Sequence, residues 1–261
     1  MSELVSEAKT EIICDTHIWY GFRDKAPEGE FLEKYAPIAT FLKIDEFAKS
    51  YKVIRSIDEV RAAILAVGEY SYNGSLIYDP PLIYLKKLSE PDFEYDTYAN
   101  LRGILNFTQD IANGKELSED KIEEFRKYCE LREKWLQDAV DIFNDEAAVI
   151  QARIRDKKKH RAEDSTLLNR EFISWYAGQV TKTDGLSDDF DWTQIELFGK
   201  VLKILFNDLE LGAIRLKPND WYDLFLLVYV NPNRKVWTND NRWTRYIKER
   251  LGLERYLYET Q

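Results

Sequence analysis

Two short apolar segments end in aspartate, more than two hundred residues apart. The first, in the stretch EIICDTHIWY, is Ile12-Ile13-Cys14, followed directly by Asp15. The second, in KVWTNDNRW, is Val236-Trp237-Thr238, followed two residues later by Asp240. A carboxylate at the end of a strand can bind a cation, exchange a proton or cap the next helix. The repetition indicates that two strands deliver acids to one site.

A third segment, KPNDWYDLFLLVYV, places Asp220 and Asp223 at the beginning of an apolar helix. Residues three apart lie on the same side of a helix. Asp220 follows Asn219, which favours a role as the helix N-cap, whereas Asp223 is the better candidate for a metal ligand. Ligands of an open parallel sheet bind beyond the carboxyl ends of its strands, where the following helices begin. We therefore expect Asp15, Asp223 and Asp240 to converge.

Such a cluster has a defined chemistry. Crowded carboxylates repel one another, so they either take up protons or bind cations. Oxygen-only ligand sets suit Mg²⁺ or Mn²⁺, and the two histidines and two cysteines lack the spacing of zinc ligands. A metal bound in this way can activate water and stabilise the charge that develops on a phosphodiester. The sequence predicts a Mg²⁺ or Mn²⁺ site suited to that hydrolysis. The alternative for Asp15 is that it only caps the helix that begins near His17.

Strands are predicted at residues 11–15 and 235–238, near the two ends of the sequence. Predicted helices cover residues 39–54, 56–70, 118–159, 165–180, 191–210, 217–230 and 242–252. The third of these is a long amphipathic helix with Ser118 as its cap, because apolar residues recur every three or four positions. This order predicts an α/β core from residues 1–68 and 211–261, interrupted by a helical insertion at 69–210.

Composition limits the classes of protein. The chain has 261 residues, 44% hydrophobic and 32% charged, as is typical of a globular protein. Its net charge of −10 argues against a protein that coats nucleic acid non-specifically, but not against a nuclease with bound cations. The apolar runs are too short to span a membrane, and no signal peptide is recognised. Two cysteines in apolar patterns favour a cytoplasmic location without disulfides.

Four segments in this order, IICDTHIWY, IDEFAKS, NDWYDLFLLVYV and VWTND, together resemble the acidic signature of PIN domains. These domains are metal-dependent ribonucleases with a three-layer α/β/α fold and a central, mainly parallel sheet. The resemblance covers about residues 9–66 and 211–252. The long helical insertion has no counterpart in the common, shorter members of the family.

The resemblance implies a role for each matching residue. The implied catalytic acids are Asp15, Glu46, Asp223 and Asp240. Of these, Asp15, Asp223 and Asp240 would be the metal ligands, with one or two Mg²⁺ or Mn²⁺ ions as cofactor. Asp45 competes with Glu46 for the second position, and Thr238 and Asp220 are expected to support the site. The implied reaction is hydrolysis of an RNA substrate.

Basic residues are candidates for contact with that RNA. The densest run is RIRDKKKHR, which includes Lys157, Lys158 and Lys159, and the last helix adds Arg242 and Arg245. The alternative is that the run is only a solvated helix end, where positive charge suits the helix dipole.

Two other functions remain open at the level of sequence. The chain can be a PIN-like module that has lost its activity and binds a protein partner or inhibitor through its helical insertion. It can also be a nuclease that acts on DNA or on flapped structures. Binding of Mn²⁺ separates the first alternative from an enzyme, and a panel of substrates separates the second. The sequence specifies no oligomeric state.

Overall fold

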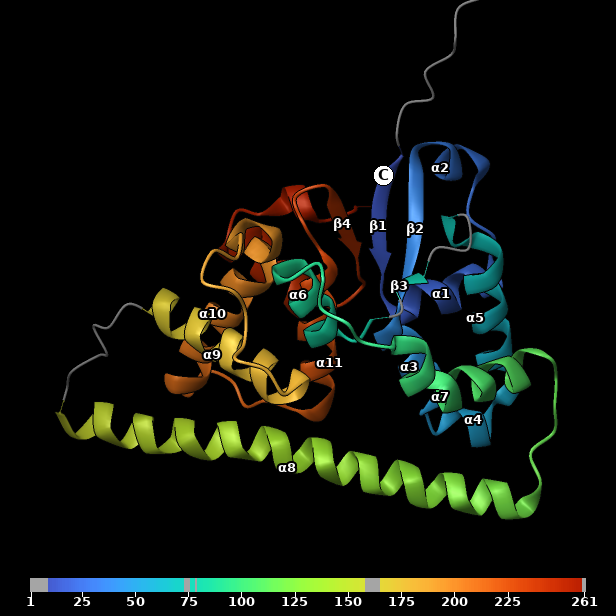
Figure 1. Ribbon diagram of the computed structural model, residues 1–261, viewed down its shortest axis with the longest axis horizontal. Helices are drawn as coiled ribbons and strands as arrows, with labels where there is room; N and C mark the ends of the chain where they lie inside the picture. Colours follow the sequence, from blue (N-terminus) through green and yellow to red (C-terminus); the bar gives the residue numbers. More distant parts are fainter. Residues whose placement is uncertain (1–8, 73–75, 78, 158–164, 260–261) are drawn as a thin grey trace, which may run out of the picture.

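A four-stranded parallel sheet lies in the middle of the molecule (Figure 1). The computed structural model describes residues 9–72, 76–77, 79–157 and 165–259. The strands are β1 (Thr10–Cys14), β2 (Tyr35–Thr40), β3 (Leu76–Ile77) and β4 (Arg234–Trp237). Their order in the sheet is β3-β2-β1-β4, and every neighbouring pair is parallel. The expected α/β class with a parallel sheet is confirmed.

The order of the strands reverses at β1. From β1 the chain adds β2 and β3 on one side, and it returns much later to place β4 on the other side. In the register of β1 and β4, Cys14 lies opposite Trp237. The backbone N–H of Asp15 extends this pairing by donating to the Trp237 carbonyl at 3.0 Å. Open sheets bind their ligands at such a reversal, beyond the carboxyl ends of the strands.

Helices cover both faces of the sheet. Alternate residues of a strand point to opposite faces, and here the side chains on both faces are apolar and buried. On one face, Ile12 and Cys14 belong to a buried apolar cluster with residues of the helices on the right of Figure 1. These helices are α1 (Thr16–Asp24), α3 (Phe41–Ala48), α4 (Lys52–Arg55), α5 (Ile57–Tyr70) and α7 (Thr97–Ala112). The short helix α2 (Gly29–Lys34) leads into β2.

On the other face, Ile13, Ile38 and Val236 belong to a second and larger buried cluster. Its helices are α6 (Pro81–Ser89), α9 (Ser165–Thr181), α10 (Glu196–Glu210), α11 (Pro218–Leu226) and α12 (Asn241–Arg245). A π-helical turn at Tyr246–Arg250 continues α12. The predicted apolar helix near residue 220 is confirmed as a buried element, since Leu224 to Val230 are all buried.

One long helix, α8 (Glu119–Lys157), crosses beneath both groups of helices (Figure 1). It begins as predicted, with the carbonyl of Ser118 accepting from the N–H of Ile122 at 2.9 Å. The thiol of Cys129 lies 3.5 Å from the carbonyl of Lys49 on the first group. The amide of Asn144 makes two hydrogen bonds with the backbone of Leu216, which precedes α11. The helix therefore connects the two sides of the sheet.

The strands β2 and β3 are not predicted from the sequence. Pro37 lies inside β2, and proline is uncommon within strands because it has no N–H to donate. The strand β3 falls inside the range 69–210 that the sequence pattern assigns to the insertion, and α7 packs against α3 and α5. The sheet and the helices on this face thus continue to about residue 112, and the division into 1–68 and 211–261 around an insertion at 69–210 stays a prediction.

Cys14 and Cys129 are both buried free thiols, as expected from their apolar surroundings. In the part of the chain that the structure describes, no helix has both the length and the apolar character needed to cross a lipid bilayer.

Candidate active site

The predicted acids meet at the carboxyl edge of β1 and β4. Asp15, Glu46, Asp223 and Asp240 all line one groove of about 1510 Å³. They arrive from four segments: the end of β1, the helix α3, the helix α11 and the turn after β4. The structure therefore brings together every acid that the sequence placed in a catalytic role.

Asp15 both caps a helix and binds a cation. Its Oδ1 accepts from the N–H of Thr16 at 2.6 Å, at the beginning of α1, and its Oδ2 accepts from the hydroxyl of Thr238 at 3.0 Å. The ammonium of Lys43 lies 2.8 Å from Oδ1. Burial favours the neutral acid, but Lys43 and these hydrogen bonds outweigh it and hold the pKa of Asp15 below its usual value. The capping alternative is thus confirmed for Asp15, and its cationic partner in this structure is Lys43, so its role as a metal ligand stays a prediction.

Lys43 is the centre of the cluster, and sequence reasoning missed it. Its side chain is 0% exposed, and its Nζ lies 2.8 Å from Asp15 and 3.1 Å from Glu46. Burial disfavours the ammonium, but the carboxylates of Glu46, Asp15 and Asp223 outweigh burial and raise the pKa of Lys43. A buried charge needs partners of opposite sign, and here acids from different segments supply them. The available signal was a lysine between Leu42 and Ile44, three residues before Glu46.

Glu46, and not Asp45, faces this lysine. The carboxylate of Glu46 accepts from Lys43 and, at 2.5 Å, from the hydroxyl of Thr16. Asp45 is buried in a separate network, where it pairs with Lys49 and accepts from the Tyr222 hydroxyl at 3.4 Å. Asp45 therefore anchors α3 to its neighbours and lies outside the Lys43 cluster.

Asp223 lies on α11, and its environment disfavours the charged form. Burial raises the pKa of this carboxyl to about 6; Lys43 opposes the shift and Asp15 adds to it. The indole N–H of Trp243 also favours the charged form, although it makes no hydrogen bond in the structure. A carboxyl with a pKa near 6 changes charge in the range where acid–base catalysis operates.

Asp240 begins the last helix and is held by Thr238. Its N–H donates to the Thr238 hydroxyl at 3.1 Å, and that hydroxyl in turn donates to Asp15. Its Oδ1 accepts from the N–H groups of Arg242 and Trp243, at 2.7 and 3.2 Å. Thr238 thus connects the two strand-end acids that were predicted to share a site.

Asp220 is a structural residue at the third position of α11, rather than the N-cap. Its Oδ2 accepts from the backbone N–H of Lys217, as in a capping box, and its Oδ1 accepts from Arg242 at 2.5 Å. It is 5% exposed. It stabilises the start of the helix, as expected, and it adds an ion pair to the last helix that the sequence did not indicate.

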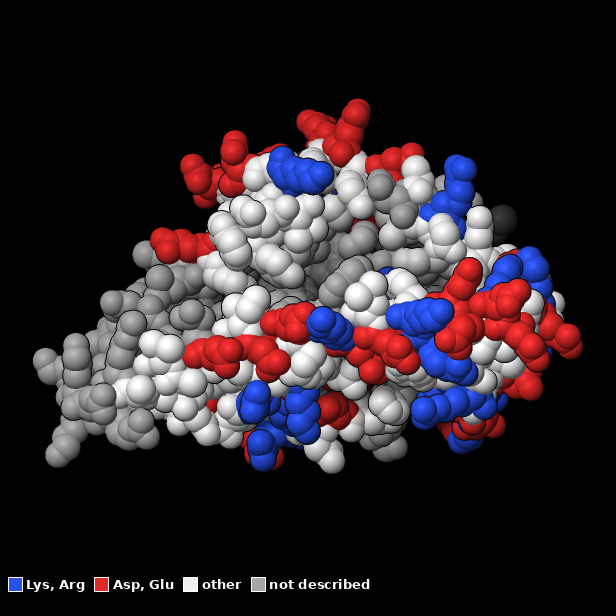
Figure 2. Space-filling model, turned by 90° about the horizontal axis from the view of Figure 1, so that it is seen from below, with Lys and Arg blue, Asp and Glu red and all other residues white. Residues whose placement is uncertain are grey.

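Basic side chains line the same groove around the acids. They are Lys49, Lys52, Arg55, Arg132, Lys134, Lys217 and Arg242. Arg132 belongs to α8, and its Nε donates to the Tyr222 hydroxyl at 3.1 Å, which fixes α8 against α11. Figure 2 shows acidic and basic side chains intermingled over the coloured part of the face that α8 crosses. Positive charge is therefore provided locally, within the groove.

The structure describes only the beginning of the predicted basic run. Lys158 and Lys159 lie outside the described residues, and Lys157 is the last residue of α8. Gln137 is the last α8 residue that lines the groove, so Lys157 is about 30 Å farther along the helix at 1.5 Å per residue. Arg242 lines the groove, whereas Arg245 is exposed and is not among the lining residues.

The acids suit a hard cation by their chemistry but not by their present spacing. No three His, Cys, Asp or Glu side chains of the described residues are close enough together to hold one metal ion. The ammonium of Lys43 lies between Asp15 and Glu46 and neutralises them. A metal ion would have to share these oxygens with Lys43 or displace it.

Comparisons with known proteins identify no relative: no family model, no curated protein and no solved structure matches this chain.

Proposed function

We propose that this chain is a metal-dependent nuclease with a PIN-like fold that hydrolyses RNA phosphodiester bonds in the groove. The observation that carries the proposal is the convergence of Asp15, Glu46, Asp223 and Asp240 on one groove. The packing of the core gives no reason for four acids from four segments to meet, because a buried acid is unfavourable unless it is paired. Their position at the reversal of strand order is where open sheets bind ligands.

The architecture supports the PIN-like part of the proposal. Helices lie on both faces of a parallel sheet, so the elements form three layers (Figure 1). The acids follow the chain order of the PIN signature: the end of the first strand, an early helix, an apolar helix and the segment after the last strand. The helix α8 and its neighbours would be the additions that distinguish this chain from shorter members.

Asp15, Asp223 and Asp240 would hold Mg²⁺ or Mn²⁺ after moving closer together than they lie here, with Glu46 beside them. Such an ion would make bound water more acidic and would stabilise negative charge on the phosphate. The residues of the chain have their own tasks. Thr238 fixes Asp15 and Asp240 relative to each other. Lys43 neutralises Asp15 and Glu46, and in that way keeps the acids together when no metal is bound.

The basic lining of the groove supports a nucleic-acid substrate. Lys52, Arg55 and Lys134 are exposed, and they line the groove with the acids. Phosphates of a strand can pair with these side chains while one phosphodiester lies over the carboxylates. The choice of RNA over DNA follows from the resemblance to PIN domains.

Lys43 favours a second candidate, a PIN-like module without catalytic activity. A fully buried ammonium between two of the acids can replace the metal ion permanently, which would leave a nucleic-acid or protein-binding groove. In that case the protein would bind strands or partners through the groove and α8 without cleaving them.

A cleavage assay with a substrate panel tests the proposal. Single-stranded RNA, single-stranded DNA and a flapped duplex are each incubated with the protein in Mn²⁺ or in EDTA. The proposal predicts cleavage of RNA that requires Mn²⁺ and disappears in Asp240→Asn. Cleavage of DNA or flaps alone would point to the structure-specific alternative. Binding without cleavage, together with no binding of Mn²⁺, would establish the inactive module.

A further inference from the structure

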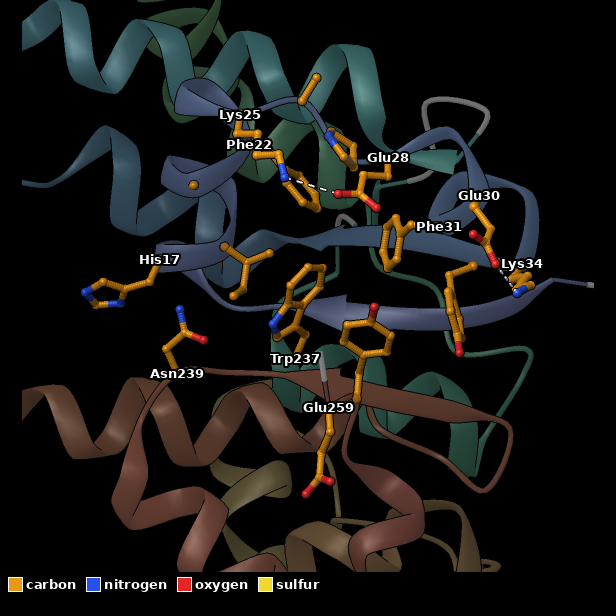
Figure 3. A pocket seen from close by; sticks show the side chains of 16 residues that line it. His17, Phe22, Lys25, Glu28, Glu30, Phe31, Lys34, Trp237, Asn239 and Glu259 are labelled. Carbon is orange, nitrogen blue, oxygen red and sulfur yellow. Dashed lines mark hydrogen bonds and ion pairs between the residues drawn. The ribbon is translucent and has the colours of Figure 1, made fainter. Parts of the chain in front are cut away.

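A second cavity adjoins the groove and is lined largely by aromatic rings. It measures about 550 Å³ and lies between α1, α2, the end of β4 and Tyr258 (Figure 3). Its size is in the usual range for sites that bind small organic groups. Neither the sequence resemblance nor the proposed hydrolysis gives this cavity a role.

Apart from the buried Phe22, the aromatic lining consists of partly exposed residues. Trp237 and Tyr258 have ring centroids 4.6 Å apart, and Phe31 lies 5.4 and 5.5 Å from them. Tyr35 extends the cluster, 5.0 Å from Tyr258. None of these four rings is fully buried, although rings of this size are strongly stabilised by burial. The cavity therefore exposes π surface on which a flat ring can stack.

The polar groups around the rings limit the class of ligand. Lys25 pairs with Glu28 at 3.1 Å, and Lys34 pairs with Glu30 at 2.6 Å (Figure 3). Because these lysines already have carboxylate partners, the cavity is poorly suited to a phosphate. The side chains of His17 and Asn239, which line one end, are exposed and offer polar groups to a ligand there. A neutral flat ring with polar edges suits this lining.

The cavity and the candidate active site share two lining residues. His17 and Asn239 line both the cavity and the groove, and their side chains lie next to each other at one end of the cavity (Figure 3). Asn239 is the residue before Asp240, and His17 is two residues after Asp15. A strand with a phosphate over the acids therefore has a neighbouring nucleotide at the entrance of the cavity.

We propose that this cavity binds a nucleobase of the substrate strand, stacked on Phe31, Trp237 and Tyr258, next to the phosphodiester in the groove. The inference rests on the proposed function, because it takes the strand in the groove as its ligand. One stacked base is worth about a five- to hundredfold change in affinity. The cavity thus sets the position of the strand relative to the acids and gives the site a requirement for a base at one position.

Binding to RNA with single abasic nucleotides tests the proposal. A short single-stranded RNA is prepared in which one nucleotide at a time lacks its base, and affinities are measured in EDTA so that no cleavage occurs. The wild type should lose about five- to a hundredfold in affinity at one position only. Phe31→Leu should bind the intact strand more weakly and should no longer distinguish that abasic strand. Trp175→Leu, at an exposed tryptophan of α9 that is not part of either cavity, is the matched control and should behave as the wild type.

The outcomes separate this proposal from the proposed function. If RNA binds but no abasic position matters, or if Phe31→Leu and Tyr258→Leu both keep the full abasic penalty, the cavity does not bind a base. Tyr258→Leu serves as the second variant if Phe31→Leu fails to fold in a melting experiment. The four ribonucleoside 5′-monophosphates are tested in parallel. If the monophosphates bind to the wild type but not to Phe31→Leu, and RNA does not bind at all, the ligand of the cavity is not a strand. That result would also reject the proposed nuclease.

Discussion

The ammonium of Lys43 lies 2.8 Å from Oδ1 of Asp15, inside the structure and without solvent exposure. Lys43 also pairs with Glu46 at 3.1 Å, and its pKa is raised by both carboxylates and by Asp223. The acids therefore have a cation supplied by the chain itself. Whether a metal ion can bind beside Lys43 or displace it decides between the proposed enzyme and the inactive module.

Replacing Lys43 should expose the acids to metal. In metal-free buffer, Lys43→Met leaves Asp15 and Glu46 without their cation, so the free energy of unfolding should fall by about 3–5 kcal/mol. Mn²⁺ should restore part of this loss, because it binds the same oxygens in the folded state only. Urea unfolding with and without Mn²⁺ measures both effects. Lys49→Met, which breaks the pair with Asp45 outside the cluster, should lose stability and keep the Mn²⁺ response of the wild type. A Lys43→Met variant that is stabilised by Mn²⁺ no more than Lys49→Met would contradict a cation site shared with Lys43.

Asp15→Asn and Asp240→Asn should have the same effect on cleavage and different effects on stability. Both remove a proposed metal ligand, so both should abolish cleavage of RNA. Asp15→Asn also removes the charge that pairs with buried Lys43, and it should destabilise the protein by about 3 kcal/mol. Asp240 makes its hydrogen bonds through one oxygen that asparagine retains, so Asp240→Asn should unfold as the wild type does. Equal stability of the two variants would show that the pair with Lys43 contributes little.

Replacing Asp220 should mainly reduce stability, whereas replacing Asp223 should mainly reduce activity. Asp220→Ala removes the bond to the Lys217 N–H and the pair with Arg242, so it should cost about 1–2 kcal/mol. Asp223→Ala should instead reduce cleavage while the protein remains folded. Denaturant unfolding and cleavage rates, measured on both variants, decide the matter. A loss of activity in Asp220→Ala that exceeds its loss of stability would assign it to the chemistry.

The free energy of unfolding should fall between pH 4 and pH 7 because of Asp223. Its pKa is about 6 in the folded protein and near 3.8 when unfolded, so in this interval the folded state binds more protons. Stability contributed by the proton is therefore complete below pH 3.8 and is lost as pH rises through 6, by up to about 3 kcal/mol. Asp223→Asn lacks this titration. The difference in unfolding free energy between variant and wild type should grow with pH in metal-free buffer. A difference that does not change with pH would mean that Asp223 is charged throughout.

The salt dependence of RNA binding should follow the groove and not the basic run. Changing Lys52, Arg55 and Lys134 together to alanine should reduce the log–log slope by about 0.7 for each phosphate that is no longer neutralised. The same change at Lys157, Lys158 and Lys159 should leave the slope unchanged, since Lys157 lies far along α8 from the groove. Binding measured across a salt series compares the two triple variants. If only the variant at Lys157, Lys158 and Lys159 has a flatter slope, the basic run is the segment that binds RNA.

Much of the site could be predicted because its signals are local. Asp15 and Asp240 follow short strands, and Asp223 lies in an apolar helix, so each position is visible in a few neighbouring residues. Lys43 could not be predicted in the same way. Lysine in a helix is usually exposed, and its burial here depends on acids from other segments. The position of the groove also escaped prediction: α8 is recognisable as a helix, but nothing local indicates that Arg132 packs on Tyr222.

The sheet was only partly predictable for a related reason. The strand β2 contains Pro37, and β3 has two residues, so neither has a periodic pattern long enough to recognise. Both are stabilised by pairing with a neighbour that lies elsewhere in the chain. The range 69–210, which the sequence pattern assigns to an insertion, contains β3, because this strand has no signal in the sequence.

The pairing of β1 with β4 has a consequence for synthesis of the protein. Glu11 on β1 and Arg234 on β4 form an ion pair across 223 residues of sequence. A ribosome that has made Asp15 and Glu46 must add most of the chain before Asp223 and Asp240 exist. Until then β1 has an open edge where β4 will lie, and an unpaired edge can join strands of other chains. The nuclease proposed above would be unable to cut the messenger RNA beside it until its last strand is translated, and its open edge would need protection over the same interval.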